Sequence, residues 1–179
     1  KSKRVQELEG ILAANDKQMR ALKDNLSQAL NAFEGRGLTI EQKNGKVYVS
    51  MENKLLFKSG SWSVNDEGRN AVVELGKVLA TNPDISVLIE GHTDNDKVLG
   101  NLGDGVQNNW DLSTKRALAI VSILTENASI DKKNLTAAGR SEYAPLMSNS
   151  TTEGKAKNRR IEVILTPNLD KINDMLNQL

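Results

Sequence analysis

Two charged side chains are spaced so that they could bind a small charged ligand. Asp94 comes just after the apolar run at residues 85–89, and Arg116 lies one turn inside the helix predicted to follow. Because sites in open sheets collect where buried strands end, a ligand could bind at this point. A carboxylate and a guanidinium on neighbouring elements also commonly pair with each other, and an exposed pair contributes only about 0–1 kcal/mol. Both interpretations stay open on these two residues alone.

The composition argues against several other chemistries. The chain has 179 residues, a formal net charge of +1, no cysteine and one histidine, His92. Without thiolates and with a single imidazole, zinc enzymes and Ser-His-Asp hydrolases are poor matches, so we expect no metal, no cofactor and no catalysis. Balanced charge and few aromatic residues argue against nucleic-acid binding. We expect His92 to be a packed, hydrogen-bonded structural residue.

The elements that position these residues begin with a predicted β-hairpin. Apolar residues recur at alternate positions over 38–51, on both sides of Asn44-Gly45. That dipeptide is typical of the type I′ turn, because both central residues of this turn need a positive φ. The apolar run at 55–57 is a candidate for another strand.

The remainder of the chain alternates between helix and strand. A helix is predicted over residues 65–81 and a buried strand over 85–89. A second helix is predicted to begin with Asp111 as its N-cap. Two further strands are predicted at 135–138 and 160–165, the second with one face in water.

These elements predict an α+β fold, with one mixed sheet and helices on one face. The sheet domain is expected to cover residues 38–166, after a helical coiled-coil spacer over 1–34. Residues 167–179 are expected to form a short amphipathic C-terminal helix. Its apolar residues are Ile172, Met175 and Leu176. No run of about 18 apolar residues is present, so no part of the sequence is expected to span a membrane.

The N-terminal helix carries an apolar stripe with coiled-coil spacing. The heptad core positions are Val5, Leu8, Leu12, Asn15, Met19, Leu22, Leu26, Ala29 and Phe33. In one interpretation the stripe forms a homo-oligomer over residues 5–33, and Asn15 fixes the register. In the other, the stripe packs on the chain's own domain. Gly35 and Gly37 are predicted to end the helix.

Five short motifs occur in the order found in one known family. They are Glu90-Gly91-His92-Thr93-Asp94-Asn95; Asn109-Trp110-Asp111-Leu112-Ser113 with Arg116-Ala117; Leu135 with Gly139; Pro145 and Asn149 with Thr152-Glu153-Gly154; and Asn158-Arg159-Arg160-Ile161-Glu162. Over about residues 47–165 the chain resembles the OmpA-like C-terminal domain, a peptidoglycan-binding module of bacterial envelope proteins. The resemblance implies a βαβαβ-type domain that grips the peptide stem of peptidoglycan without cutting it.

The resemblance also implies the ligand and the residues that bind it. The family's ligand is the diaminopimelate residue, which presents an ammonium and a carboxylate on one short side chain. Asp94 matches the acidic residue expected to meet the ammonium. Arg116 matches the helix arginine expected to hold the carboxylate through two parallel hydrogen bonds. The second basic candidate is Arg159, and further implied contacts come from Thr93, Asn95 and Leu112.

Three neighbouring features carry expectations of their own. Alternation along a strand sends Arg160 to the face opposite Arg159, where we expect a structural salt bridge. Trp110 is expected to be either a lid or core plug, or a platform for a sugar. The loop at 96–108 carries three glycines and is longer than in many family members, so it could either reshape the mouth of the site or bind a second element.

The resemblance finally implies a location and a role. The domain would tether an outer-membrane or other envelope protein to the wall from the periplasm, with a lipid or membrane anchor outside this segment. The alternative is a stator-type motor protein, or another envelope scaffold, whose oligomeric helix controls wall binding. An upstream lipid-anchor motif would favour the tether, and an upstream transmembrane helix with an ionisable residue would favour the motor.

Overall fold

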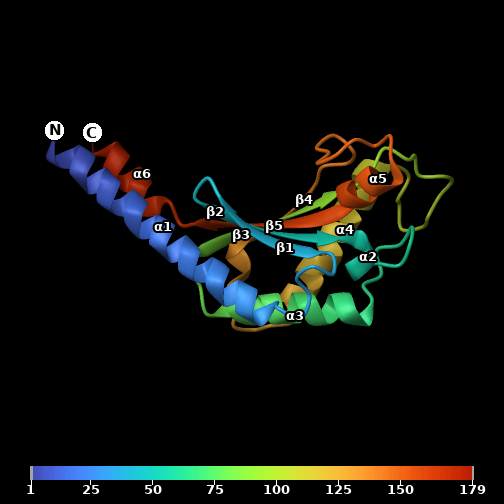
Figure 1. Ribbon diagram of the computed structural model, residues 1–179, viewed down its shortest axis with the longest axis horizontal. Coiled ribbons are helices and arrows are strands. Elements are labelled where there is room, and N and C mark those ends of the chain that lie inside the picture. Colours follow the sequence, from blue (N-terminus) through green and yellow to red (C-terminus); the bar gives the residue numbers. More distant parts are fainter. Residues whose placement is uncertain (1, 179) are drawn as a thin grey trace.

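The computed structural model describes residues 2–178, apart from the side chains of residues 171, 172, 175 and 176. Its centre is a five-stranded sheet with the order β1-β2-β5-β3-β4 (Figure 1). The strands are β1 (Leu38–Lys43), β2 (Lys46–Glu52), β3 (Ile85–His92), β4 (Leu135–Gly139) and β5 (Arg160–Pro167). β3 and β4 run parallel, whereas the other neighbouring pairs are antiparallel, which confirms the predicted mixed sheet.

The long helices pack against one face of this sheet (Figure 1). The helices are α1 (Lys3–Ala29), α2 (Asn53–Leu56), α3 (Asp66–Ala80), α4 (Asn109–Leu124), α5 (Thr152–Asn158) and α6 (Asp170–Asn177). On the central strand β5, the fully buried Ile161, Val163 and Leu165 alternate with residues of the other face and join the core beneath α1, α3 and α4. Within residues 2–178, no helix combines the length and apolar character needed to cross a bilayer.

The predicted hairpin of β1 and β2 is confirmed. Lys43 pairs with Lys46 across a two-residue turn. The φ angles of Asn44 and Gly45 are 54° and 75°, as a type I′ turn requires. The local turn chemistry therefore sets the register of the whole edge of the sheet.

The start of α4 differs from the prediction. The helix begins at Asn109, and Asn108 is its N-cap, since the Asn108 Oδ1 accepts a hydrogen bond from the Asp111 N–H at 2.9 Å. Asp111 lies in the first turn, and its Oδ2 accepts from the Gln107 N–H at 3.0 Å. Two side chains thus reach across the helix start in opposite directions, in the manner of a capping box.

The second half of α1 belongs to the core of the domain. Met19, Leu22 and Leu26 are almost completely buried among the core side chains. Val5 and Leu12, earlier in the same stripe, are 40% and 58% exposed. The later heptads therefore pack on the chain's own domain. Pairing with another copy stays a prediction, and it concerns the first half of the helix.

The predicted strand at residues 55–57 was wrong. The chain instead turns into the one-turn helix α2, and Phe57 forms only an isolated bridge with Val64. The turn is held by the Asn53 N–H, which donates to the Arg159 carbonyl oxygen at 2.9 Å. A short apolar run has no periodicity that separates a strand from a buried turn of helix.

The end of α1 and the presence of α5 also differ from the prediction. α1 ends at Ala29 rather than at the glycines, because the chain tightens into a turn in which the Phe33 N–H donates to the Leu30 carbonyl. α5 was not predicted. α6 confirms the C-terminal helix and runs beside the first part of α1 (Figure 1). Its predicted apolar residues Ile172, Met175 and Leu176 lie outside the described side chains.

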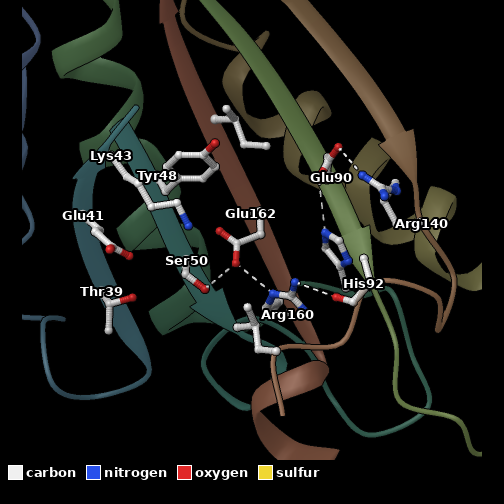
Figure 2. Close-up of a pocket in the computed structure, with 13 residues that line it drawn as sticks. Thr39, Glu41, Lys43, Tyr48, Ser50, Glu90, His92, Arg140, Arg160 and Glu162 are labelled. Atoms are coloured by element: carbon white, nitrogen blue, oxygen red, sulfur yellow. Dashed lines mark hydrogen bonds and ion pairs between the residues drawn. The ribbon is translucent and has the colours of Figure 1, made fainter. Parts of the chain in front are cut away.

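The sheet face opposite the helices carries charged side chains that pair with one another (Figure 2). Arg160 Nε donates to Glu162 Oε1 at 2.8 Å, which confirms the predicted structural salt bridge.

His92 is buried, and its Nε2 lies 3.3 Å from Glu90 Oε1. Arg140 Nη1 lies 3.3 Å from the other oxygen of Glu90. The hydrogen bond with His92 is the main cause that lowers the pKa of the Glu90 carboxyl below its ordinary value. The packed structural role predicted for His92 is confirmed.

Replacing Leu26 with alanine is expected to lower the free energy of unfolding by about 2–5 kcal/mol, because a fully buried leucine leaves a cavity. Leu12→Ala, at an exposed position of the same stripe, is the matched control and should change the free energy by less than about 0.5 kcal/mol. Urea unfolding at two protein concentrations measures both. Equal losses in the two variants, growing as the protein is concentrated, would contradict the core role of α1.

Glu90→Gln is expected to lower the free energy of unfolding at pH 7 by about 1 kcal/mol. The folded-state pKa of Glu90 lies below the ordinary value of 4.5, so this contribution is complete above that pH. It should disappear as the pH falls through the lower folded-state pKa. Urea unfolding of variant and wild type from pH 7 to pH 2 measures the gap, with Glu7→Gln on the exposed side of α1 as control. A gap that does not change with pH would disprove the linkage.

Candidate functional site

Three charged residues from separate parts of the chain meet at one cleft. Asp94 follows β3, Arg116 lies on α4, and Arg159 lies between α5 and β5. The cleft has a volume of about 500 Å³. We call it the Asp94 cleft, and its wall includes Thr93, Asp94, Asn109, Leu112, Arg116 and Arg159.

Asp94 is paired with Arg159 rather than with Arg116. Its Oδ2 accepts a hydrogen bond from Arg159 Nη1 at 2.6 Å, and its Oδ1 accepts from the Asp96 N–H at 2.9 Å. Asp94 itself is only 5% exposed. The carboxylate is therefore fixed in position, with Arg159 as its structural partner. The simple pairing of Asp94 with Arg116 does not occur.

Arg116 is a buried cation without a carboxylate of its own. It is 5% exposed, and among the described residues it forms no salt bridge. Its Nε donates to the Ser61 carbonyl oxygen at 2.9 Å, and its guanidinium lies 5.4 Å from the centroid of the Phe57 ring. Burial, followed by the nearby charge of Arg159, lowers the pKa of Arg116 to about 10, against the opposing effect of Asp94. This desolvated positive charge opens onto a cleft, where an anion would stabilise it.

Close packing of α4 on β3 brings these groups together. A Cβ atom on Gly91 would lie 2.0 Å from the Ser113 carbonyl oxygen, so only glycine permits this approach. Beyond the strand, the Thr93 N–H donates to the Ser141 carbonyl oxygen at 2.9 Å, while the Ser141 N–H donates to Ser113 Oγ at 3.1 Å. The segment carrying Asp94 is thus held against the first turns of α4.

The other predicted site residues divide into two groups. Thr93 and Leu112 are buried in the cleft wall, and Thr93 Oγ1 donates to the Asp94 carbonyl oxygen at 2.8 Å. Asn95 is exposed and lies outside the described residues that line the cleft. A ligand contact by Asn95 stays a prediction that this position does not favour.

Sequence reasoning gave no role to Asn109, which organises the cleft wall. It is buried, and its Nδ2 donates to the Asp96 carbonyl oxygen at 2.9 Å and to the Asp94 carbonyl oxygen at 3.4 Å. The signal was present, because Asn109 begins the motif that contains Trp110 and Asp111. The motif could not show in which direction the side-chain amide of Asn109 points.

The loop at 96–108 forms one side of the cleft mouth. Val98, Leu99 and Leu102 all line the cleft, although Leu99 is 86% exposed. The start of the loop is tied down by Lys155 Nζ, which lies 2.7 Å from Asp96 Oδ1. Apolar side chains therefore border the charged floor. Across the described residues, no group of histidine, aspartate and glutamate side chains is arranged to hold a metal ion.

Two curated relatives share this part of the chain. Motility protein B of Bacillus subtilis (strain 168) is 36% identical over 119 residues, which cover 66% of this chain and 44% of that protein. The probable lipoprotein YiaD of Escherichia coli (strain K12) is 30% identical over 135 residues, covering 75% of this chain and 58% of that protein. The chain thus spans about half the length of these relatives.

Solved structures share the fold. The cell wall anchor of the T6SS from Pseudomonas aeruginosa has a TM-score of 0.70 and 29% identity, over 79% of this chain and 96% of that one. A MotB-like protein from Desulfovibrio vulgaris has a TM-score of 0.77 over 88% of this chain and 96% of that one, and its 20% identity shows the fold alone.

The family model described as the OmpA family matches residues 56–159, more than half of the chain. The resemblance drawn from the motifs is therefore confirmed, and the chain belongs to the OmpA family.

Proposed function

We propose that the Asp94 cleft binds the peptide stem of peptidoglycan at its diaminopimelate residue, without cutting it, and so tethers an envelope protein to the cell wall. The observation that carries this proposal is the buried Arg116, which faces a cleft and has no carboxylate partner among the residues that the structure describes. Family membership supports it, as does the likeness to a protein that is a cell wall anchor.

The carboxylate of the ligand would bind Arg116. Because Nε already donates to the Ser61 carbonyl oxygen, the plane of the guanidinium is held and its terminal nitrogens are left to donate. A carboxylate can accept two parallel hydrogen bonds from such a group. Because Arg116 is buried, each charge-assisted bond that it donates is stronger than it would be in water.

The ammonium of the ligand would bind Asp94. This carboxylate is shared with Arg159, and its remaining lone pairs can accept from a second cation. Taken together, Asp94, Arg116 and Arg159 carry one negative and two positive charges. A ligand that presents both an ammonium and a carboxylate gives Arg116 a carboxylate partner and places its ammonium on the remaining lone pairs of Asp94. An anion without the ammonium would meet only half of this arrangement.

The location follows from the ligand, so we place the domain in the periplasm, at the outer membrane or another envelope structure. A stator-type motor protein is the second candidate. It is favoured by the 36% identity to motility protein B and by the partly exposed first half of α1. Two features would distinguish them: a lipid-anchor motif in the protein would fit the tether, and a transmembrane helix with an ionisable residue would fit the motor.

Arg116→Met removes the charge while keeping much of the side-chain volume. Affinity for a diaminopimelate-containing stem peptide is expected to fall at least about thirtyfold, because losing one partner of a buried charge pair costs about 2–5 kcal/mol. The melting temperature of the free protein should stay the same or rise, since an unpaired buried cation has been removed. Calorimetric titration and thermal unfolding measure the two effects. Arg69→Met, on the exposed surface of α3, is the control and should bind as wild type. Wild-type affinity in Arg116→Met would refute the role.

Amidation of the diaminopimelate carboxylate tests the same contact from the side of the ligand. The wild type is expected to bind the amidated stem peptide at least about tenfold more weakly, a difference of about 1.4 kcal/mol. Arg116→Met should bind both peptides equally, which makes a double-mutant cycle between residue and ligand group. Asp94→Asn should bind both more weakly and still distinguish them. If Asp94→Asn, rather than Arg116→Met, abolishes the distinction, the two residues have been assigned to the wrong groups.

A further inference from the structure

An exposed pair of aromatic rings lies beside the Asp94 cleft. Trp110 is 50% exposed and Tyr143 is 67% exposed. Their ring centroids are 5.5 Å apart, and the ring planes are tilted by 34°. Such exposure excludes the role of core plug for Trp110. Large exposed apolar side chains that gather in one place commonly mark a binding surface.

The two rings line a second cleft that adjoins the first. This aromatic cleft has a volume of about 270 Å³, and Lys97, Val98 and Asn109 belong to its wall as well as to the wall of the Asp94 cleft. A ligand that fills the Asp94 cleft can therefore extend into the aromatic cleft without leaving the surface.

The geometry of α4 explains why the clefts adjoin. Asn109, Leu112 and Arg116 are three and four residues apart, so they share one helix face and line the Asp94 cleft. Trp110 lies one position further round the helix and lines the aromatic cleft instead. The same first turns of α4 thus carry a charged site and an aromatic one.

The wall of the aromatic cleft has the chemistry that recognises a sugar. A pyranose ring has apolar C–H faces, which pack on aromatic rings, and a rim of hydroxyl and amide groups, which need hydrogen-bond partners. Besides the two rings, the wall contains Gln107, Asn108 and Glu142, whose amide and carboxylate groups could serve that rim.

We propose that the aromatic cleft is a saccharide subsite, which holds the sugar ring of the glycan to which the bound stem peptide is attached. This inference rests on the function proposed for the Asp94 cleft. In peptidoglycan the stem is short and begins on the sugar itself. A sugar would therefore lie within a few residues of the bound diaminopimelate, at most about 3.6 Å of chain for each residue. Two clefts with a common wall meet that requirement.

The test compares two ligands that share one stem peptide, one of which also carries the disaccharide. Calorimetric titration with the full chain should show that the wild type binds the disaccharide form about tenfold more tightly. Trp110→Ala should lose this preference and keep the wild-type affinity for the bare peptide. Tyr143 lies outside α4, and Tyr143→Ala should have the same effect. Tyr48→Ala, on the open face of the sheet, is the aromatic control and should keep the preference (Figure 2).

The alternatives give different results. If the wild type binds both ligands equally, the sugar subsite is refuted, while the proposed function stands; the aromatic pair would then fit a protein partner. If Trp110→Ala weakens both ligands to the same degree, the indole shapes the Asp94 cleft and the subsite is refuted. If the folded wild type binds neither ligand, the proposed function fails and the subsite fails with it.

Discussion

A desolvated guanidinium is the constraint on which the site depends. Arg116 is buried in the wall of a cleft, and within the described part of the chain it has no carboxylate partner, so the free protein carries an unfavourable charge there. The fold can hold such a group because the rest of the domain is firmly packed: the β5 core, the helices beneath it and half of α1 form one continuous cluster. Under the proposed function, a ligand carboxylate would relieve this cost.

Glycine makes the arrangement of the site possible. Gly91 and Gly139 lie on neighbouring parallel strands, and both allow the first turns of α4 to come into contact with the sheet backbone. A side chain at either position would push α4 outward and separate Arg116 from Asp94. The charges that define the cleft are thus positioned by two residues that carry no functional group at all.

Local chemistry made much of the fold predictable. Asn44-Gly45 specifies its turn through backbone angles alone, and the order of the five motifs was enough to indicate the family. Short segments were not predictable in the same way. α2 and α5 have too few residues to show a period, so tertiary hydrogen bonds decide their form. The choice of Arg159 as the partner of Asp94 likewise depends on where β5 begins relative to β3.

The way α1 is half embedded and half projecting has a mechanical consequence. Met19, Leu22 and Leu26 lock the later turns into the domain, while the first turns run beside α6 at the end that carries both chain termini (Figure 1). A pull applied at the N-terminus travels along a continuous helix to the hydrophobic core. Because β1 follows the embedded turns of α1 in the chain, a load applied there would reach the core through α1 before it reaches the sheet.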